Sequence, residues 1–199
     1  MLKNLQSGEV LYRVQEQGDN RHLKKLLWKD DQPSGPIFER RSVRHYRQRA
    51  VEEEKIELLL RAAMQAPSAK NQQPWEIIVL ENRKIMKELA LGLDYGKMLD
   101  HAPLCFIMLG NMDNLKSPLR WPQDLAAATQ NVLLEATEIG LGSVWVSLYP
   151  DEQRMGHVRE VMDVEESLIP FNIIALGYPQ EFPAPVDRFD RSKVHRIKE

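Results

Sequence analysis

The sequence predicts a domain of mixed helices and strands, because segments with helical spacing of apolar residues alternate with short apolar runs. The chain has 199 residues, a length typical of one globular domain, and 43% of them are hydrophobic, which suffices for a sizeable core. Regular alternation of helices and strands favours a parallel, doubly wound α/β sheet. On periodicity alone we therefore expect parallel strands, although strand direction itself leaves no mark in this pattern.

The first 35 residues differ in composition from the rest of the chain. Residues 1–31 carry mixed charge, and Leu23, Leu26 and Leu27 form an apolar stripe at helical spacing. The next residues, through Pro36, are rich in proline and glycine, as is typical of a linker. The sequence therefore predicts an N-terminal helical extension and linker over residues 1–35, followed by a main domain over residues 36–199. We expect the extension to lie across the main domain or a partner subunit.

Within the main domain, local signals mark where helices begin and end. Pro67 ends an amphipathic segment, and Asn82 is a suitable N-cap for the next helix. Asp124 lies at the start of a long apolar face that ends at Gly140, and Asp151 starts a further helix. In chain order we predict a helix over 51–66, a strand over 75–80, a helix over 82–91, a strand over 104–109, a helix over 122–139, a strand over 143–148, a helix over 151–162, a strand over 169–176 and a proline-rich, charged tail.

Composition excludes several classes of protein. Lys and Arg total 27 against 29 Asp and Glu, and the net charge of -2 provides no general attraction for nucleic acid or an anionic membrane. The single cysteine, Cys105, lies in an apolar run, which excludes an intramolecular disulfide and favours a buried thiol in a reducing cytoplasm. The histidines lack metal-ligand spacing, so no metal site is expected. Without an export signal or a long uncharged run, we expect a soluble, cytoplasmic protein.

One local basic patch, at residues 40–49, contrasts with the nearly neutral charge of the whole chain. Guanidinium groups beside the Ser42 hydroxyl suit a phosphate or the polar edge of a heterocycle, because they present several donors in fixed directions. In extended backbone Arg40, Ser42 and Arg44 would share one face, with Arg41 on the other. The alternative is a solvated basic surface neutralised by Glu52–Glu54. Five arginines fall within ten residues: Arg40, Arg41, Arg44, Arg47 and Arg49.

A polar loop over residues 66–75 is the second candidate. Pro67 and Pro74 bracket it, and between them Ser68, Asn71 and Gln73 offer donors and acceptors on a stiff frame. Its alternative interpretation is an ordinary polar turn.

The two segments together resemble a known family. An Arg-Arg-Ser-x-Arg-x-Tyr run at 40–46 precedes a helix and then Ala-Pro-Ser-x-x-Asn-x-Gln-Pro-Trp at 66–75. This pair, continued at 124–145 and again near Arg188 and His195, resembles the nitroreductase family of FMN-dependent oxidoreductases. The resemblance implies an α+β fold in which helices surround a mainly antiparallel sheet, and an intertwined homodimer with shared FMN sites. That contradicts the parallel sheet suggested by periodicity, and we follow the resemblance.

The resemblance also implies roles for particular residues. Arg40 and Ser42 match positions at the FMN phosphate and ribityl chain, and Arg44 matches a position at the pyrimidine edge of the flavin. The loop at 67–73 would come from the partner subunit, and the strand at 146–148 would lie against the isoalloxazine ring. The candidate cofactor-binding residues are Arg40, Arg41, Ser42, Arg44, Pro67, Ser68, Asn71, Gln73, Val146, Ser147, Leu148 and Arg188.

Within this set, some assignments have alternatives. Arg188 would be a second phosphate-binding cation, a role that Lys193 or Arg196 could take instead. Arg41 lies between Arg40 and Ser42 in the sequence, and its alternative is a surface or structural role. Arg47 and Arg49, outside the candidate set, have the same interpretation.

The implied chemistry belongs to the flavin. Hydride would pass from NADH or NADPH through FMN N5 to a small planar acceptor of the nitroaromatic, quinone or enone class, in a ping-pong scheme. No catalytic side chain is therefore expected. The acceptor pocket is expected from residues 95–101 and 114–121 and the partner's extension, where Tyr95 and Trp121 could stack on the acceptor or simply pack. The alternatives are an FMN-binding sensor or storage protein without a physiological acceptor and, much less favoured, a nucleic-acid-binding module.

Overall fold

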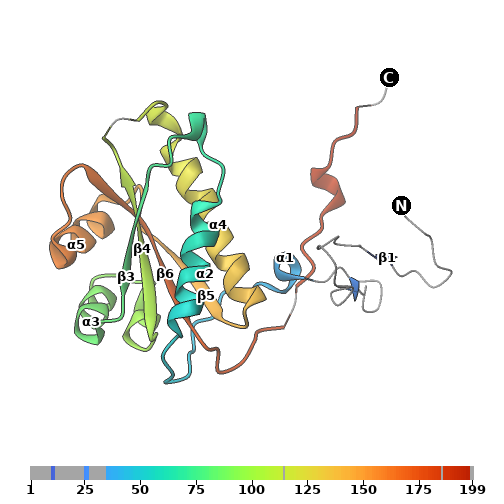
Figure 1. Ribbon diagram of the computed structural model, residues 1–199, viewed down its shortest axis with the longest axis horizontal. Coiled ribbons are helices and arrows are strands. Elements are labelled where there is room, and N and C mark those ends of the chain that lie inside the picture. The colour runs from blue at the N-terminus through green and yellow to red at the C-terminus, as the bar shows by residue number, and fades with distance from the viewer. Residues whose placement is uncertain (1–9, 12–24, 27–34, 114, 185, 198–199) are drawn as a thin grey trace, which may run out of the picture. The chain divides into compact units, whose positions relative to one another are not determined.

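The computed structural model of the chain describes residues 10–11, 25–26, 35–113, 115–184 and 186–197. The chain divides into two compact units, of which the larger is Gly35–Pro183 and the smaller combines Met1–Ser34 with Ala184–Glu199. The larger unit contains a sheet with helices on both faces (Figure 1). Its elements, in chain order, are α1 (Pro36–Glu39), α2 (Glu53–Met64), the 3₁₀ turn η1 (Ala69–Asn71), β3 (Trp75–Leu80), α3 (Arg83–Leu91), the 3₁₀ turn η2 (Lys97–Asp100), β4 (Leu104–Asn111), the 3₁₀ turn η3 (Pro118–Arg120), α4 (Trp121–Glu138), β5 (Gly142–Ser147), α5 (Glu152–Met162) and β6 (Leu168–Gly177).

The strands of this sheet are antiparallel. Within the described residues their order is β3-β4-β6-β5, and each neighbouring pair runs in opposite directions. The parallel arrangement suggested by periodicity is wrong, and the α+β fold implied by the family resemblance is confirmed. The pattern misled because the central strands β4 and β6 are covered on both faces. They therefore have the continuous apolar sequence that is usual for strands of parallel sheets.

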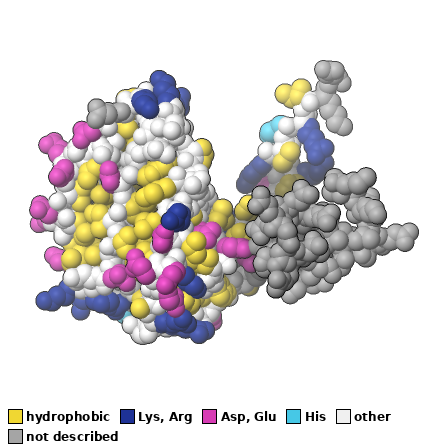
Figure 2. Space-filling view, in the orientation of Figure 1, with side chains coloured by type: hydrophobic (Ala, Val, Ile, Leu, Met, Phe, Trp, Pro, Cys, Tyr) yellow, Lys and Arg dark blue, Asp and Glu magenta, His cyan; other side chains and the backbone are white. Residues whose placement is uncertain are grey.

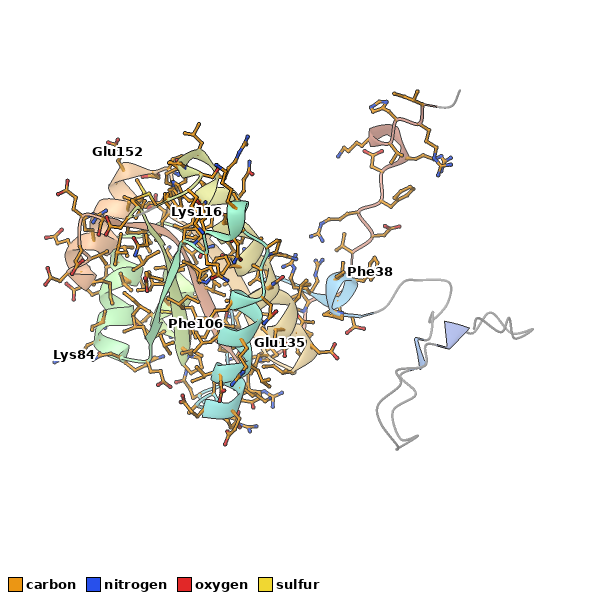
Figure 3. The ribbon with its side chains drawn as sticks, turned by 45° about the horizontal axis from the view of Figure 1, so that its top comes forward. Phe38, Lys84, Phe106, Lys116, Glu135 and Glu152 are labelled. Atoms are coloured by element: carbon orange, nitrogen blue, oxygen red, sulfur yellow. The ribbon has the colours of Figure 1, made fainter. Side chains whose placement is uncertain are left out.

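Two hydrophobic clusters lie on opposite faces of the sheet. On β4, Phe106 belongs to the cluster that includes Leu125 of α4, and its neighbour Ile107 belongs to the cluster that includes Met86 and Leu89 of α3. Figure 3 shows Phe106 inside the unit, between the sheet and α2. Because successive strand residues point to opposite faces, β4 contributes to both clusters. The sheet thus forms the middle of three layers, with α2 and α4 on one side and α3 and α5 on the other (Figure 1).

The helix starts that depend on local chemistry agree with the sequence. Asn82 accepts hydrogen bonds from the backbone N–H groups of Lys84 and Ile85, at 3.0 and 3.3 Å. Asp151 accepts one from the Arg154 N–H at 3.1 Å. Both N-caps predicted from the sequence are therefore confirmed. A residue with positive φ, Gly140 at 78°, follows α4 and lets the chain turn into β5.

The single cysteine is a structural residue. Cys105 is fully buried in β4, and burial raises the pKa of its thiol to about 12. A thiol in this state is inert at neutral pH, as the sequence predicted. Within the described parts of the chain, no helix has the length and apolar character needed to cross a membrane.

The smaller unit has little regular structure among its described residues. The short strands β1 (Val10–Leu11) and β2 (Lys25–Leu26) pair in antiparallel fashion. The helix predicted over residues 1–31 is therefore wrong at these positions, since β2 includes one leucine of the predicted stripe. The other two, Leu23 and Leu27, lie outside the described residues, as does the rest of the predicted extension and most of the linker.

Candidate functional site

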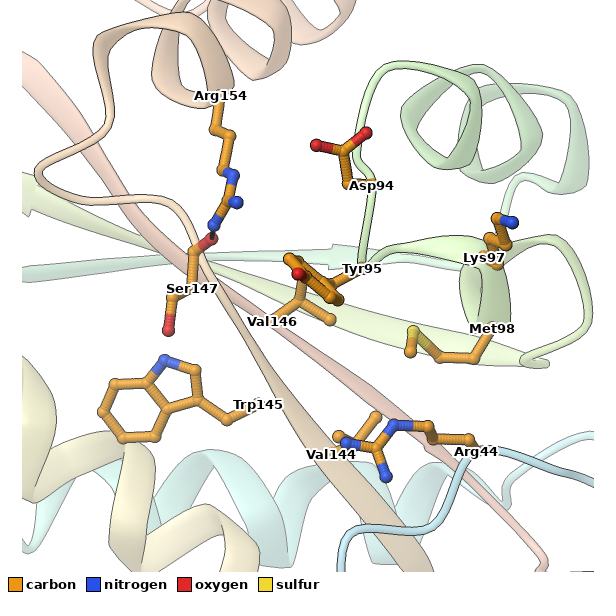
Figure 4. Close-up of a pocket in the computed structure, with 10 residues that line it drawn as sticks. All are labelled: Arg44, Asp94, Tyr95, Lys97, Met98, Val144, Trp145, Val146, Ser147 and Arg154. Carbon is orange, nitrogen blue, oxygen red and sulfur yellow. Dashed lines mark hydrogen bonds between the residues drawn. The ribbon is translucent and has the colours of Figure 1, made fainter.

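A cavity of about 440 Å³ opens beside β5, on the face of the sheet that carries α3 and α5. Its size falls within the range of about 300–1,000 Å³ that is typical of cofactor and ligand pockets. Strand β5 is at the edge of the sheet, so the cavity is bounded by one strand and by the segments that extend past that edge. The cavity is lined by Arg44, Asp94, Tyr95, Lys97, Met98, Val144, Trp145, Val146, Ser147 and Arg154 (Figure 4).

The cavity lies near the point where the chain leaves α3. Helix α3 ends at Gly92, where an added Cβ would lie 2.3 Å from the imidazole of His157 on α5. The two helices therefore approach closely at this point. Beyond it the chain turns at Tyr95 and enters η2 at Lys97, and both residues line the cavity beside β5. Tyr95 is 74% exposed, so its ring is available to a ligand.

The basic segment reaches the cavity by pairing with β5. Ser42 forms a parallel bridge with Ser143, whose carbonyl accepts a hydrogen bond from the Val43 N–H at 2.9 Å. Val43 is buried, whereas Ser42 and Arg44 on either side are exposed, as expected of extended backbone. At Gly142 an added Cβ would lie 2.7 Å from the Val43 side chain, so this close approach requires glycine. Arg44 is thereby positioned at the cavity.

The five arginines have different surroundings. The Arg47 Nε donates to the Pro179 carbonyl at 3.0 Å. Arg49 pairs with Glu52 and lies 4.0 Å from the centre of the Tyr178 ring. A structural role for Arg47 and Arg49 is thus confirmed, and Arg44 lines the cavity.

Arg40 and Arg41 are half-buried. Within the described residues, the buried Nε of Arg41 has no hydrogen-bond partner. Its cofactor-binding role remains a prediction, as does that of Arg40.

Two arginines lie at opposite ends of the cavity, with apolar surface between them. Figure 4 shows Arg44 and Arg154 at opposite ends, with Val146 and Tyr95 between them. The Arg154 guanidinium is held by Asp151, with 3.2 Å between Nε and Oδ2, and lies 5.5 Å from the Tyr95 ring centre. Cations beside an apolar wall suit a flat heterocycle with a polar edge that can take negative charge.

Some of the predicted cofactor-binding residues meet at this cavity and others do not. Arg44, Val146 and Ser147 line it. Leu148, the residue after β5, is buried in the hydrophobic cluster on this face of the sheet and does not line the cavity.

Sequence reasoning placed Lys97 in the acceptor region and missed Arg154 altogether. A lysine two residues after Tyr95 was a visible signal, because both belong to the predicted pocket segment. Arg154 lies on α5 and had none, since its distance from β5 depends on how the helix packs.

Trp121 is a packing residue. Its ring contacts those of Tyr149 and Phe171, with centroids 4.7 and 5.8 Å away in edge-on geometry, and it is buried. The packing alternative is therefore confirmed for Trp121, whereas Tyr95 lines the cavity. Asn114, in the same predicted acceptor segment, lies outside the described residues.

The polar loop lies apart from the cavity of its own chain. Within the described part of the chain, none of residues 67–73 lines that cavity. Lys70, Asn71 and Gln73 have φ values of 53°, 51° and 47°, in the left-handed region that favours glycine. Ser68 stabilises the turn, because its Oγ accepts from the Gln73 N–H at 3.0 Å. Left-handed residues cost about 1–3 kcal/mol each and persist only where other contacts fix them. The cofactor-binding role of the loop and its alternative, an ordinary polar turn, remain predictions.

Arg188 belongs to the smaller unit, where it is exposed. Nearby, the 3₁₀ turn η4 (Arg191–Lys193) is capped by Asp190, which also pairs with Lys193 at 3.6 Å. A hydrogen bond from Ser192 lowers the pKa of Asp190. The phosphate-binding role of Arg188, and the alternatives Lys193 and Arg196, remain predictions.

The helix-flanked antiparallel sheet, with a cation-lined pocket at its edge strand, defines the larger unit as an α+β domain. Residues 37–93 and 91–178 match the Nitroreductase family. A protein of Archaeoglobus fulgidus provisionally named NADH dehydrogenase/NAD(P)H nitroreductase is 40% identical over 166 residues, covering 81% of this chain and 95% of its own length. The chain belongs to the nitroreductase family.

Solved structures agree with this assignment. The crystal structure of a provisionally named NADH oxidase from Clostridium acetobutylicum is 44% identical, with a TM-score of 0.80 over 82% of this chain and 99% of its own. An FMN-dependent nitroreductase from Clostridium difficile is 29% identical, with a TM-score of 0.76 over 83% of this chain and 99% of its own.

Proposed function

We propose that this protein is an FMN-dependent oxidoreductase that transfers hydride from NADH or NADPH to a small planar acceptor of the nitroaromatic, quinone or enone class. The observation that carries the proposal is the cation-lined cavity beside β5 in a chain of the nitroreductase family. Relatives named for NAD(P)H nitroreductase and FMN-dependent activity support the cofactor and the co-substrate. The buried, inert Cys105 is compatible with a cytoplasmic location, which we include in the proposal.

The residues around the cavity fit FMN. A flavin is flat, with an apolar dimethylbenzene end and a pyrimidine edge of carbonyls and ring nitrogens. Val144 and Val146 offer an apolar surface for the ring, and Arg44 and Lys97 offer donors and positive charge for the pyrimidine edge. Arg40 and Ser42, on the same extended segment as Arg44, would take the phosphate and ribityl chain.

The chain's part in the reaction is positioning and electrostatics. When bound, FMN would supply the hydride-transfer chemistry between NAD(P)H and the acceptor. Arg44 and Lys97 would stabilise negative charge at the pyrimidine edge, because donors fixed in advance need no reorganisation. The apolar wall around Val146 would exclude water from the reacting face. No side chain is assigned a catalytic role.

A homodimer with shared sites is part of the proposal. Helix α1 buries none of its residues, and Ile37 and Phe38 on it are 67% and 49% exposed. Leu58 and Met64 of α2 are 44% and 52% exposed. Figure 2 shows apolar side chains open to solvent among the charged ones of the larger unit. A second copy that covers these side chains would bring its own 67–73 loop to the flavin.

The dimer proposal is tested by mixing two variants, Arg44→Met and Asn71→Ala. If each site uses Arg44 of one subunit and Asn71 of the other, a mixed dimer has one intact site, and mixing raises NAD(P)H oxidation at limiting FMN above the level of either variant alone. Activity that stays at the level of the separate variants would contradict a shared site.

The experiment for the reaction is anaerobic reduction of the FMN-loaded protein by NADH and by NADPH, followed by a panel of nitroaromatics, quinones and enones. We expect bleaching of the bound flavin by at least one nucleotide and reoxidation by an acceptor. Bound FMN that stays oxidised at millimolar nucleotide would favour a sensor or storage protein. Protein that does not take up FMN at all would overturn the proposal.

A further inference from the structure

The 67–73 loop has a shape that its own sequence does not favour. Lys70, Asn71 and Gln73 are all in the left-handed region, although none is glycine. Such a conformation is kept only when other contacts fix it. The bond from the Gln73 N–H to the Ser68 Oγ is one of these, and further hydrogen bonds come from outside the loop. The source of those hydrogen bonds therefore decides whether the Ser68 and Asn71 side chains keep fixed positions on the loop.

Asp124 supplies two of the bonds from outside, beside the one that the Lys70 Nζ donates to the Lys116 carbonyl at 3.1 Å. Asp124 lies in the first turn of α4 and is 5% exposed. Its Oδ1 accepts a hydrogen bond from the Ala69 N–H at 2.9 Å, and its Oδ2 accepts one from the Gln72 Nε2 at 2.6 Å. The carboxylate thus binds the loop at a backbone atom and at a side chain, fifty-five and fifty-two positions away in the chain. Negative charge is favourable at this end of a helix.

The Gln72 amide extends the connection to a third segment. Its Oε1 accepts from the Ser117 N–H at 2.8 Å, and its Nε2 also donates to the Ser117 carbonyl at 3.3 Å. The Asp124 carboxylate accepts only, so it orients the Gln72 amide with nitrogen inward and oxygen toward the Ser117 N–H. An amide at position 124 would make a donor face a donor, whichever way Gln72 turned.

We propose that Asp124 is the positioning residue of the FMN site. It holds the 67–73 loop in the one shape in which Ser68, Asn71 and Gln73 meet the flavin of the other subunit, without touching the flavin itself. This inference rests on the proposed function, because only a shared FMN site gives the loop a cofactor to contact. A carboxylate this deeply buried is otherwise unfavourable, and here both of its oxygens are used on the loop.

The first test is Asp124→Asn, with two readouts. We expect the FMN dissociation constant to rise about tenfold, the effect of losing about 1.4 kcal/mol. In the FMN-free protein we expect faster hydrogen exchange at the Ala69 and Ser117 amides, which reports the loop directly. The matched control is Asn131→Ala, also on α4, which removes the bond from Nδ2 to the Ala62 carbonyl at 3.0 Å. It should lower thermal stability but leave FMN affinity unchanged.

The second test exchanges the two polar groups. Gln72→Glu alone places a second carboxylate against Asp124, and we expect weaker FMN binding. In the double variant Gln72→Glu with Asp124→Asn, the amide introduced at 124 donates to the carboxylate introduced at 72, which still accepts from the Ser117 N–H. Only the bond to the Ser117 carbonyl is lost. We therefore expect FMN affinity to recover to within a few-fold of the parent protein.

The outcomes separate this inference from the proposed function. A parent protein that fails to bind FMN would overturn the proposed function and this inference with it. A parent that binds FMN, with unchanged affinity in Asp124→Asn or no acceleration of exchange at Ala69, would overturn this inference alone. If Asp124→Asn does not fold, the double variant decides, because a soluble double variant that binds FMN no better than Gln72→Glu contradicts the exchange of roles.

Discussion

The two faces of the sheet are covered in different ways, although the same strands form both. On one face α2 and α4, of 12 and 18 residues, close over a continuous hydrophobic cluster around Phe106. On the other face α3 and α5, of 9 and 11 residues, are shorter, and the chain turns through Tyr95 and Lys97 instead of continuing as helix. The cavity lies on this second face, lined in part by these two residues.

Because of this difference, we expect substitutions on one face to change stability and substitutions at the cavity on the other face to change ligand affinity. The closed face has its side chains packed against each other, so a change there alters the free energy of unfolding. The open face presents cations and an apolar wall to a ligand, so a change at Arg44 alters affinity with little effect on packing. The closed face also carries Asp124 on α4, which binds the 67–73 loop and, in the proposed dimer, would thereby serve the site indirectly.

The largest effect is expected from Phe106→Ala on the closed face. Phe106 is fully buried, and removing a buried ring loses its transfer free energy and leaves a cavity. We expect the free energy of unfolding to fall by about 3–5 kcal/mol in a denaturant titration. FMN affinity of the folded protein should hardly change. The control is Val79→Ala at the edge strand β3, which is 38% exposed and should cost less than about 1 kcal/mol. Equal costs at the two positions would contradict the effect of burial, since Phe106 is buried and Val79 is exposed.

On the open face, Arg44→Met should have the opposite signature. The change keeps the aliphatic stem and removes the charged donors, so FMN binding should weaken by about 1.5–3 kcal/mol while thermal stability is retained. Fluorescence titration of FMN measures it. Arg47→Met is the matched control from the same basic run, because its guanidinium binds the Pro179 carbonyl away from the cavity. The assignment of Arg44 fails if the two variants lose the same affinity.

A pair of glycines contrasts a tightly packed strand position with an exposed helix position. At Gly110 of β4, an added Cβ would lie 2.5 Å from the Trp121 ring, which Tyr149 and Phe171 hold in place. Gly110→Ala should therefore destabilise the protein by about 1–3 kcal/mol. At Gly156, inside α5 on the open face, an added Cβ meets nothing within 4 Å. Gly156→Ala should stabilise it by about 0.5–1 kcal/mol, because alanine is the better helix former. Melting temperatures that shift in the same direction would contradict this contrast.

The smallest effect concerns the acid side of the pH profile. A hydrogen bond from Tyr178, aided by Arg49, lowers the pKa of Glu52 beside α2 to about 2, from 4.5. The folded state thus favours the ionised form, and this stabilisation is present above pH 4.5 and lost as pH falls toward 2. Glu52→Gln should flatten the dependence of unfolding free energy on pH in that window, with Glu53→Gln as control. A slope unchanged by Glu52→Gln would refute the role of this contact.

Much of the secondary structure was predictable from the sequence because its signals are local. The strand at 75–80 has the predicted bounds, and the helices that begin after Asn82 and Asp151 do so because each side chain caps the turn that follows it. The basic run and the polar loop were also recognisable. The spacing of the motifs can be read along the sequence without a structure, so it identified the family that the comparisons confirm.

The rest depended on contacts between distant parts of the chain. The direction of β4 and β6 is set by hydrogen bonds across the sheet, which buried apolar runs do not encode. Arg154 reaches the cavity only through the packing of α5.

The sequence by itself determined the family and the helix caps and drew attention to the basic run and the polar loop, because each of these depends on a short stretch of side chains. Only the tertiary structure decided which of the arginines lines the cavity and what holds the polar loop. Arg44 is at the cavity because Ser42 pairs with Ser143, and the loop keeps its shape because Asp124 binds it from the start of α4. Both depend on pairings between residues far apart in the chain, which form only when the whole sheet and its helices are in place.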